Sequence, residues 1–317
     1  MKAVFLDYAS LDQQDLDFSM LEAVFSELTL YAVTERAEVL ERIQHADVVI
    51  SNKVIINAEL LKQCSQLKLI LISATGTNNI DLQQAKAQGI VVCNCQAYGT
   101  SAVAQHTLML MLNLATSFRQ YDRAVQQGEW NKSNQFCLLD YPIIELKGKT
   151  LGVLGYGELG QAVAQLATAF GMKVLVGALP QRQYTERRVT FDELLAQSDF
   201  LSLHCPLTTE TKDLIDAQAF EKMKPTAFLI NCARGGIVNE QALADALIQR
   251  KIAGAATDVL TVEPPKGGNI LFNTNIPNLI ITPHSAWGSV DARQRIVQQM
   301  VENTLAFQQG QPIRQVN

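Results

Sequence analysis

A glycine-rich sequence, LGVLGYGELG, occupies positions 151–160, between an apolar strand-like run and a helical pattern. Another strand-like run follows at 174–176. In a G-x-G-x-x-G turn, the first glycine permits a tight turn, the second lets the backbone approach a pyrophosphate, and the third lets helix and strand pack closely. The strand–turn–helix–strand order around Gly155, Gly157 and Gly160 therefore predicts a dinucleotide site, and not merely a glycine-rich turn.

Strand-like and helix-like segments alternate on both sides of this turn. Strands interleaved with helices are typical of a mostly parallel sheet covered on both faces, so we expect an α/β fold. The second half has six strand-like runs, the number expected of a complete dinucleotide-binding sheet. The expected strands are 3–6, 28–33, 48–51, 69–72 and 90–93 in the first half, and 151–154, 174–176, 200–203, 228–231, 253–257 and 279–282 in the second.

The length of 317 residues suits two domains. An amphipathic segment at 101–119 is expected to be a helix that connects them. The tail at 290–307 is also helical in pattern, and it has no partner left in the second sheet, so we expect it to return to the first domain. The expected architecture is a Rossmann domain at 100–287 and a smaller, flavodoxin-like α/β substrate domain formed by 1–99 and 288–317, with a hinge and a cleft between them.

The composition excludes several classes of protein. It is 48% hydrophobic and 18% charged, as in ordinary globular proteins, and the net charge of −5 offers no basic surface for nucleic acid or an anionic membrane. Asp7 interrupts the N-terminal apolar run, and no stretch reaches the ~20 apolar residues of a membrane span, so a cytoplasmic protein is expected. The six cysteines lack CxxC spacing, and several lie in apolar runs, so we expect core thiols and neither disulfides nor a metal site.

The choice of cofactor depends on the residues after the strand at 174–176. An NAD site normally has an acidic residue there for the adenosine ribose, but this chain has Ala178. Arg182, Arg187 and Arg188 follow. Their guanidinium groups suit the 2′-phosphate of NADP, although they suit a solvated loop equally well. Both NAD and NADP are therefore candidates.

Three candidate catalytic residues each follow a different strand of the second sheet. Hydride transfer to a 2-keto acid requires a group that binds the carboxylate and an acid that protonates the developing alkoxide. Arginine binds carboxylates in a bidentate manner, and histidine titrates near neutrality. Taken singly, Arg234, Glu263 and His284 each fit a purely structural role as well as a catalytic one. Together, at the carboxyl ends of parallel strands, they predict a carboxylate clamp and a histidine acid that a glutamate orients.

Two further histidines have structural as well as functional interpretations. His204 follows an expected strand, where it either lines the cofactor groove or packs structurally. His106 lies inside the expected long helix, where we expect a packing or interface role.

An ordered set of motifs resembles the D-isomer-specific 2-hydroxyacid dehydrogenase family over nearly the whole chain: GYGELG, HCPLT, NCARGG, DV…EPP and TPHSAWGS. Within this family, FCLLDYPIIELKGKTLGVLGYGELG, ATGTNNIDL and HSAWGSVDAR are most similar to glycerate dehydrogenases, also called hydroxypyruvate reductases. The resemblance implies an NAD(P)-dependent oxidoreductase that acts on the CH–OH group of small D-2-hydroxyacids. It implies reduction of hydroxypyruvate or glyoxylate to D-glycerate or glycolate, or the reverse reaction. It also implies a homodimer.

The resemblance further implies a role for individual residues. Arg234 falls on the substrate-binding arginine, Glu263 on the glutamate that orients the histidine, and His284 on the acid–base histidine. The other implied substrate-binding residues are Asn52, Lys53, Ala74, Thr75 and Gly76. Besides Arg234 and His284, the implied cofactor-binding residues are Thr100, Gly155, Gly157, Glu158, Leu159, Gly160, Ala178, His204, Cys205, Pro206, Thr211, Cys232, Ala233 and Asp258, the last at the nicotinamide carboxamide.

Two alternatives stay open at this point. Some relatives with this fold are dinucleotide-sensing corepressors, which bind a cofactor without consuming it. The presence of all three candidate catalytic residues argues against that interpretation. The other alternative is an NADP-preferring reductase of a different small 2-keto acid.

Overall fold

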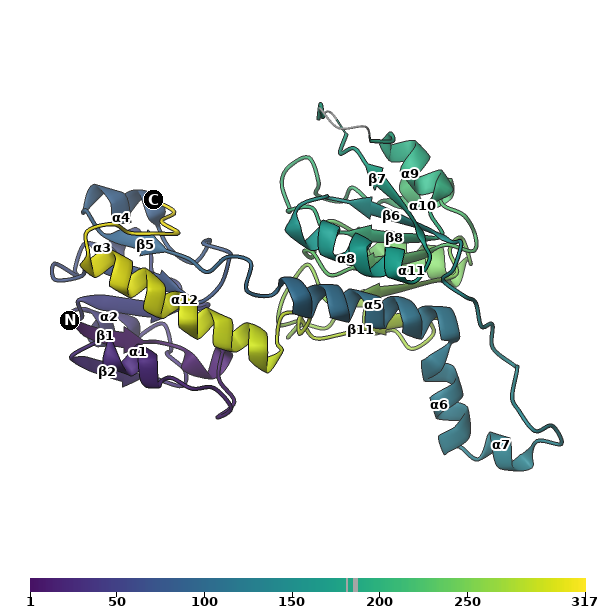
Figure 1. The fold of residues 1–317 in the computed structure, drawn as a ribbon, viewed down its shortest axis with the longest axis horizontal. Helices are drawn as coiled ribbons and strands as arrows, with labels where there is room; N and C mark the ends of the chain where they lie inside the picture. Colours follow the sequence, from purple (N-terminus) through teal and green to yellow (C-terminus); the bar gives the residue numbers. More distant parts are fainter. Residues whose placement is uncertain (181, 185–187) are drawn as a thin grey trace. The chain divides into compact units, whose positions relative to one another are not determined.

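The computed structural model describes all residues except 181 and 185–187. The chain divides into two compact units (Figure 1). One comprises Met1–Gly99 and Gly288–Asn317, and the other comprises Thr100–Trp287. Arg187, considered above for phosphate binding, lies outside the described residues.

The first unit is a five-stranded parallel sheet with the strand order β2-β1-β3-β4-β5, which is the flavodoxin-like order. Every residue of β3 and β4 is buried, because helices cover both faces of a parallel sheet. The last helix, α12, packs on α1 and β4 (Figure 1). The strands are β1 (Lys2–Phe5), β2 (Glu27–Leu30), β3 (Val48–Ser51), β4 (Leu69–Ile72) and β5 (Val91–Cys93), and the α-helices are α1 (Ser19–Ala23), α2 (Val39–Ile43), α3 (Ala58–Leu61), α4 (Leu82–Ala87) and α12 (Val290–Gln308).

The second unit is a six-stranded parallel sheet with the order β11-β10-β9-β8-β6-β7. In a Rossmann sheet, the third strand in sequence lies beside the second one, at the edge of the sheet. Here a single parallel bridge between Gly177 and Val189 occupies that place. The expected six runs are therefore correct in number, but the third Rossmann strand is reduced to one bridge, and β11 extends the opposite edge. The strands are β6 (Thr150–Leu154), β7 (Lys173–Gly177), β8 (Phe200–Leu203), β9 (Phe228–Asn231), β10 (Gly254–Thr257) and β11 (Leu279–Ile281).

Helices cover this sheet, and two of them project from it. The helices packed on the sheet are α5 (Thr100–Thr116), α8 (Glu158–Ala169), α9 (Phe191–Gln197), α10 (Ala217–Lys222) and α11 (Glu240–Ile248). The single helix expected at 101–119 is wrong at its end, because Ser117 adopts the left-handed conformation (φ +50°) and donates its hydroxyl to the carbonyl of Pro142. The chain restarts as α6 (Phe118–Gln126) and α7 (Glu129–Lys132), which extend away from the sheet (Figure 1).

The buried cysteines behave as core residues. All six cysteines are free thiols, and Cys93 and Cys95 are fully buried, as expected. Burial raises the pKa of Cys93 to about 11 and that of Cys95 to about 12, so neither thiol is ionised near neutral pH. Among the residues that the structure describes, no helix combines the length and apolar character needed to cross a membrane.

Candidate active site

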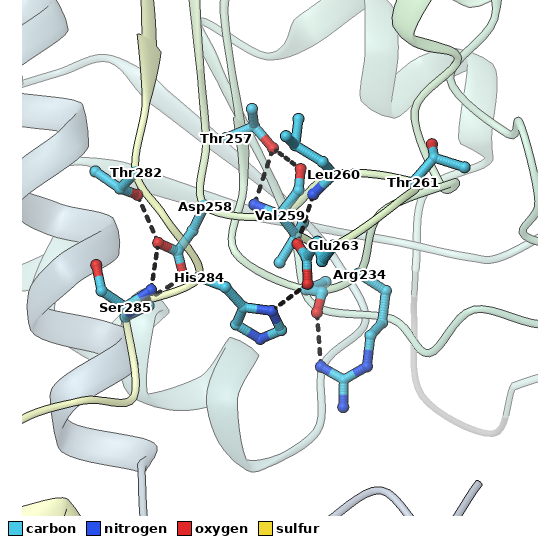
Figure 2. Close-up of polar contacts among 12 residues, drawn as sticks. Arg234, Thr257, Asp258, Val259, Leu260, Thr261, Glu263, Thr282, His284 and Ser285 are labelled. Carbon is cyan, nitrogen blue, oxygen red and sulfur yellow. Dashed lines mark hydrogen bonds and ion pairs between the residues drawn. The ribbon is translucent and has the colours of Figure 1, made fainter. Parts of the chain in front are cut away.

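A hydrogen bond joins the side chains of His284 and Glu263 in the second unit (Figure 2). The His284 Nδ1 atom lies 2.5 Å from Oε2 of Glu263. Because a carboxylate only accepts hydrogen bonds, Nδ1 carries the hydrogen, and Nε2 is the nitrogen left for proton exchange. The imidazole side chain is 37% exposed, so a small molecule can reach it.

The loop after β10 orients the Glu263 carboxylate. Its Oε1 atom accepts a hydrogen bond from the backbone N–H of Leu260 (2.7 Å), so both oxygens of the carboxylate have donors. Glu240, the first residue of α11, holds the same loop, because its two oxygens accept from the Thr261 N–H (2.7 Å) and the Asn269 side-chain amide (2.9 Å). The carboxylate therefore has one defined orientation toward the imidazole.

The turn that carries His284 is held by Asp258, a residue that is only 1% exposed. The Asp258 carbonyl accepts from the His284 N–H (2.8 Å), and its carboxylate accepts from the N–H groups of Ser285 and Ala286 (2.9 Å each). These contacts hold His284 in the left-handed region (φ +53°), which costs a non-glycine residue about 1–3 kcal/mol. Such a conformation persists only where the surroundings impose it, as Asp258 does here.

Arg234 lies beside this pair because the loop after β9 packs directly on the loop after β10. A Cβ atom at Gly235 would lie 1.8 Å from the carbonyl oxygen of Leu260, so only glycine allows this approach. Arg234 is exposed and donates from Nη1 to the carbonyl of Ala233 (2.7 Å). Figure 2 shows its guanidinium on the same side as the His284 imidazole. The structure thus brings together the arginine, the glutamate and the histidine.

The glycine-rich turn between β6 and α8 has the form that a pyrophosphate requires. Gly155 has φ +94°, and a Cβ atom there would lie 2.4 Å from the Cys205 amide nitrogen. Gly157 caps the N-terminus of α8, and a Cβ atom on it would meet no atom of the described residues within 4 Å, so the backbone is open to a ligand. A Cβ atom at Gly160 would lie 2.1 Å from the Gly155 carbonyl oxygen, which explains the close approach of helix and strand. These residues fit a dinucleotide phosphate.

Further residues implied in cofactor binding lie around this turn. Thr100 donates to Glu158 at the start of α8 (Oγ1–Oε1 2.6 Å), so the first turns of α5 and α8 are tied together. The His204 Nε2 atom pairs with the Ser202 hydroxyl (2.8 Å), while its buried Nδ1 atom has no hydrogen-bond partner among the described residues. Burial lowers the pKa of His204 to about 4, so its ring is neutral at physiological pH. A neutral ring with an unused nitrogen is compatible with a ligand contact.

The remaining implied contacts are mostly buried. Thr211 is 1% exposed, and its hydroxyl donates to the Pro206 carbonyl (2.6 Å), so it braces the loop after β8. Cys205, Cys232 and Ala233 are also buried, whereas Leu159 and Ala178 are half-buried. Burial raises the pKa of Cys205 to about 11 and that of Cys232 to about 12, so both thiols are neutral packing groups.

Comparison with known proteins identifies the family. A family model described as "D-isomer specific 2-hydroxyacid dehydrogenase, NAD binding domain" matches residues 108–286, which include the glycine-rich turn, Arg234, Glu263 and His284. The chain belongs to this family. It is therefore an oxidoreductase with an NAD-binding domain, as its sequence motifs predict.

Relatives of this dehydrogenase match it over its whole length. A glycerate dehydrogenase from Methylorubrum extorquens is 46% identical over 98% of this chain and 97% of its own. A hydroxypyruvate reductase from Blautia hydrogenotrophica is 39% identical over 100% of both chains. Among solved structures, an acyclic imino acid reductase in complex with NADPH and D-Arg is 29% identical, with a TM-score of 0.86 and 100% of both chains covered.

The implied substrate-binding residues of the dehydrogenase outside the second unit lie in two loops of the first unit. The Asp7 carboxylate holds the first loop, because it accepts from the backbone N–H groups of Asn52 (2.9 Å) and Lys53 (2.7 Å). The second loop, 74–76, is held where the Ala74 carbonyl accepts from the Cys95 N–H and the Thr75 hydroxyl donates to the Cys95 carbonyl (3.0 Å each). Each loop follows the carboxyl end of its strand, β3 or β4.

Two residues that hold loops of the site, Asp7 in the first unit and Glu240 in the second, are not among the candidates predicted from the sequence. Asp7 interrupts an apolar run in the sequence, but an aspartate two residues after a parallel strand is also a recognisable signal of a functional position. Glu240 gave no comparable signal, since a glutamate in the first turn of a helix is common for electrostatic reasons alone.

Proposed function

We propose that this dehydrogenase interconverts hydroxypyruvate or glyoxylate with D-glycerate or glycolate, using a nicotinamide dinucleotide. The observation that carries the proposal is the Glu263–His284 hydrogen bond beside the exposed guanidinium of Arg234. The names of the two relatives, glycerate dehydrogenase and hydroxypyruvate reductase, support this choice of small 2-keto acid. The glycine-rich turn of Gly155, Gly157 and Gly160 is proposed to hold the cofactor pyrophosphate.

His284, Glu263 and Arg234 each have a defined task in this proposal. When bound, the reduced cofactor supplies the hydride for C2 of the keto acid. Arg234 binds the substrate carboxylate and polarises the adjacent carbonyl. The Nε2–H group of His284 donates a proton to the carbonyl oxygen, and Glu263 accepts the Nδ1–H hydrogen bond throughout, which keeps the ring aligned. One hydride and one proton convert the keto acid into the hydroxy acid, and the imidazole is left neutral.

For the cofactor, we propose that the enzyme uses NAD and also accepts NADP. Ala178, the residue directly after β7, offers no carboxylate to repel a 2′-phosphate. Arg182 is exposed, and the Arg188 guanidinium lies 3.9 Å from the centre of the Tyr184 ring, so two cations follow this strand end. The NADPH complex of the imino acid reductase supports the same conclusion.

A panel of 2-keto acids assayed with NADH and NADPH tests both proposals. We expect hydroxypyruvate and glyoxylate to give the highest kcat/KM values and pyruvate a lower one. The comparison uses kcat/KM because specificity is a ratio of catalytic efficiencies. Because no carboxylate at position 178 repels the 2′-phosphate, NADPH should support a kcat/KM comparable with that of NADH. Loss of absorbance of the reduced cofactor is the measurement. If cofactor binds but no keto acid consumes it, the protein is a sensor and the proposal is wrong.

We also propose that two copies associate through the segment that contains α6, α7 and the following residues up to β6. Large apolar side chains in this segment are exposed, including Phe136 (89%) and Leu139 (76%), and unpartnered apolar surface of this kind is typical of protein interfaces. Sedimentation of the full chain should give twice the mass of one 34.9 kDa subunit. A serine at position 136 (Phe136→Ser) should shift the equilibrium toward the monomer. A wild-type monomer at all concentrations would contradict this proposal.

A further inference from the structure

His106 makes polar contacts that a packing role does not require. It lies inside α5, and its side chain is 15% exposed. Its Nε2 atom is 3.0 Å from Oγ1 of Thr282 and 3.6 Å from Oδ1 of Asp258. The packing or interface role expected from the sequence is therefore incomplete, because the ring faces the residue that holds the His284 turn.

The direction of each hydrogen bond in this group can be derived. Thr282 Oγ1 lies 2.5 Å from Asp258 Oδ1, which also accepts from the Ser285 N–H. The hydroxyl therefore gives its only hydrogen to Asp258, and it can only accept from His106. The Nε2 atom of His106 must then carry a hydrogen. Burial lowers the pKa of His106 and the charge of Asp258 opposes this, so the net effect keeps the ring neutral at pH 7.

The result is a chain of hydrogen bonds from α5 to the catalytic turn. His106 donates to Thr282, Thr282 donates to Asp258, and Asp258 accepts from the backbone N–H groups of residues 284–286. Each bond fixes the orientation of the next acceptor. We propose that His106 and Thr282 are positioning residues for the reaction. They align the Asp258 carboxylate, and through it the imidazole of His284 and the contact with the nicotinamide carboxamide that the family resemblance implies for Asp258. This inference rests on the proposed role of His284.

Matched substitutions separate alignment from packing. His106→Leu and Thr282→Val fill the same space without a hydrogen-bond donor, whereas His106→Gln and Thr282→Ser retain one. Loss of one hydrogen-bond donor from a network that ends on a charged group typically changes an equilibrium constant about tenfold or more. We therefore expect His106→Leu and Thr282→Val to lower kcat about tenfold or more and to weaken NADH binding. His106→Gln and Thr282→Ser should stay within about threefold of the wild type.

Nitrogen-15 NMR of histidine-labelled enzyme gives a readout that does not depend on turnover. A slowly exchanging Nε2–H signal of His106 is expected in the wild-type chain, and Thr282→Val should abolish its protection. Because the residues act as one chain, the double variant His106→Leu/Thr282→Val should be no slower than the slower single variant. Additive losses would overturn the proposal. So would equal losses in His106→Leu and His106→Gln accompanied by equal falls in Tm, since that pattern indicates packing alone.

The same experiments distinguish the failure of this inference from the failure of the proposed function. If the wild-type enzyme reduces no 2-keto acid, the proposed function is wrong, but the NMR signal and the NADH dissociation constants still test the hydrogen-bond chain. If the wild type is active and His106→Leu retains full kcat and full NADH affinity, the positioning role is wrong.

Discussion

Replacement of His284 by alanine is expected to lower kcat by about 10²- to 10⁴-fold, the usual contribution of a positioned general acid. In the structure, His284 Nδ1 is bonded to Glu263, Nε2 has no such bond to any of the described residues, and the side chain is 37% exposed. Removal of the ring removes the proton donor for the carbonyl oxygen. NADH affinity should change little, because the glycine-rich turn that is proposed to hold the pyrophosphate lies between β6 and α8.

Glu263→Gln is the matched control for this variant. Glutamine keeps the size of the side chain and can still accept from the Leu260 N–H, but it no longer places a charge beside Nδ1. We expect an intermediate loss of kcat, smaller than that of His284→Ala. Steady-state kinetics and NADH fluorescence titration measure the two effects separately. A loss below about tenfold in His284→Ala would show that another group supplies the proton.

Replacement of Arg234 by alanine is expected to lower kcat/KM for the keto acid by about 10²- to 10⁴-fold. Two charge-assisted hydrogen bonds to a carboxylate contribute roughly 1.5–3 kcal/mol each, and about 1.4 kcal/mol corresponds to a factor of ten. Arg234 is suited to this clamp because its guanidinium is exposed and, among the described residues, its hydrogen bond goes to the carbonyl of the neighbouring Ala233. KM for NADH should change far less than KM for the keto acid.

Arg234→Lys separates charge from geometry. Lysine retains the positive charge but cannot bind a carboxylate with two parallel hydrogen bonds, so it should recover only part of the lost kcat/KM. Addition of free guanidinium to the alanine variant is a second check, and it should partly restore turnover. Normal turnover of Arg234→Ala without any addition would contradict the carboxylate-clamp role.

The strands were predictable because each one is a short apolar run between polar helices. For β3, β4, β8 and β9 the expected bounds and the structure agree at both ends. The third Rossmann strand was not predictable, because it survives only as the bridge at Val189, and one bridge leaves no apolar period to detect. The break at Ser117 was missed for a related reason, since a single left-handed residue does not interrupt a helical pattern.

The candidate site was only partly visible in the sequence. Arg234, Glu263 and His284 could be predicted as neighbours, because residues after adjacent parallel strands share one edge of a sheet, and the structure places them after β9, β10 and β11. The residues that support them were not predictable. His106 lies in a helix far away in the chain, and its contact with Thr282 depends on the packing of α5 on the sheet, which no local pattern encodes.

The central claim is that this enzyme moves a hydride from nicotinamide to C2 of a small 2-keto acid while His284 protonates the oxygen. Incubation of the wild-type enzyme with 4,4-dideuterated NADH and hydroxypyruvate tests it most directly, with mass spectrometry and chiral separation of the product. We expect D-glycerate with one deuterium at C2, and almost none of this product from His284→Ala over the same time. Bound cofactor with no deuterium in any product of the wild-type enzyme would contradict it.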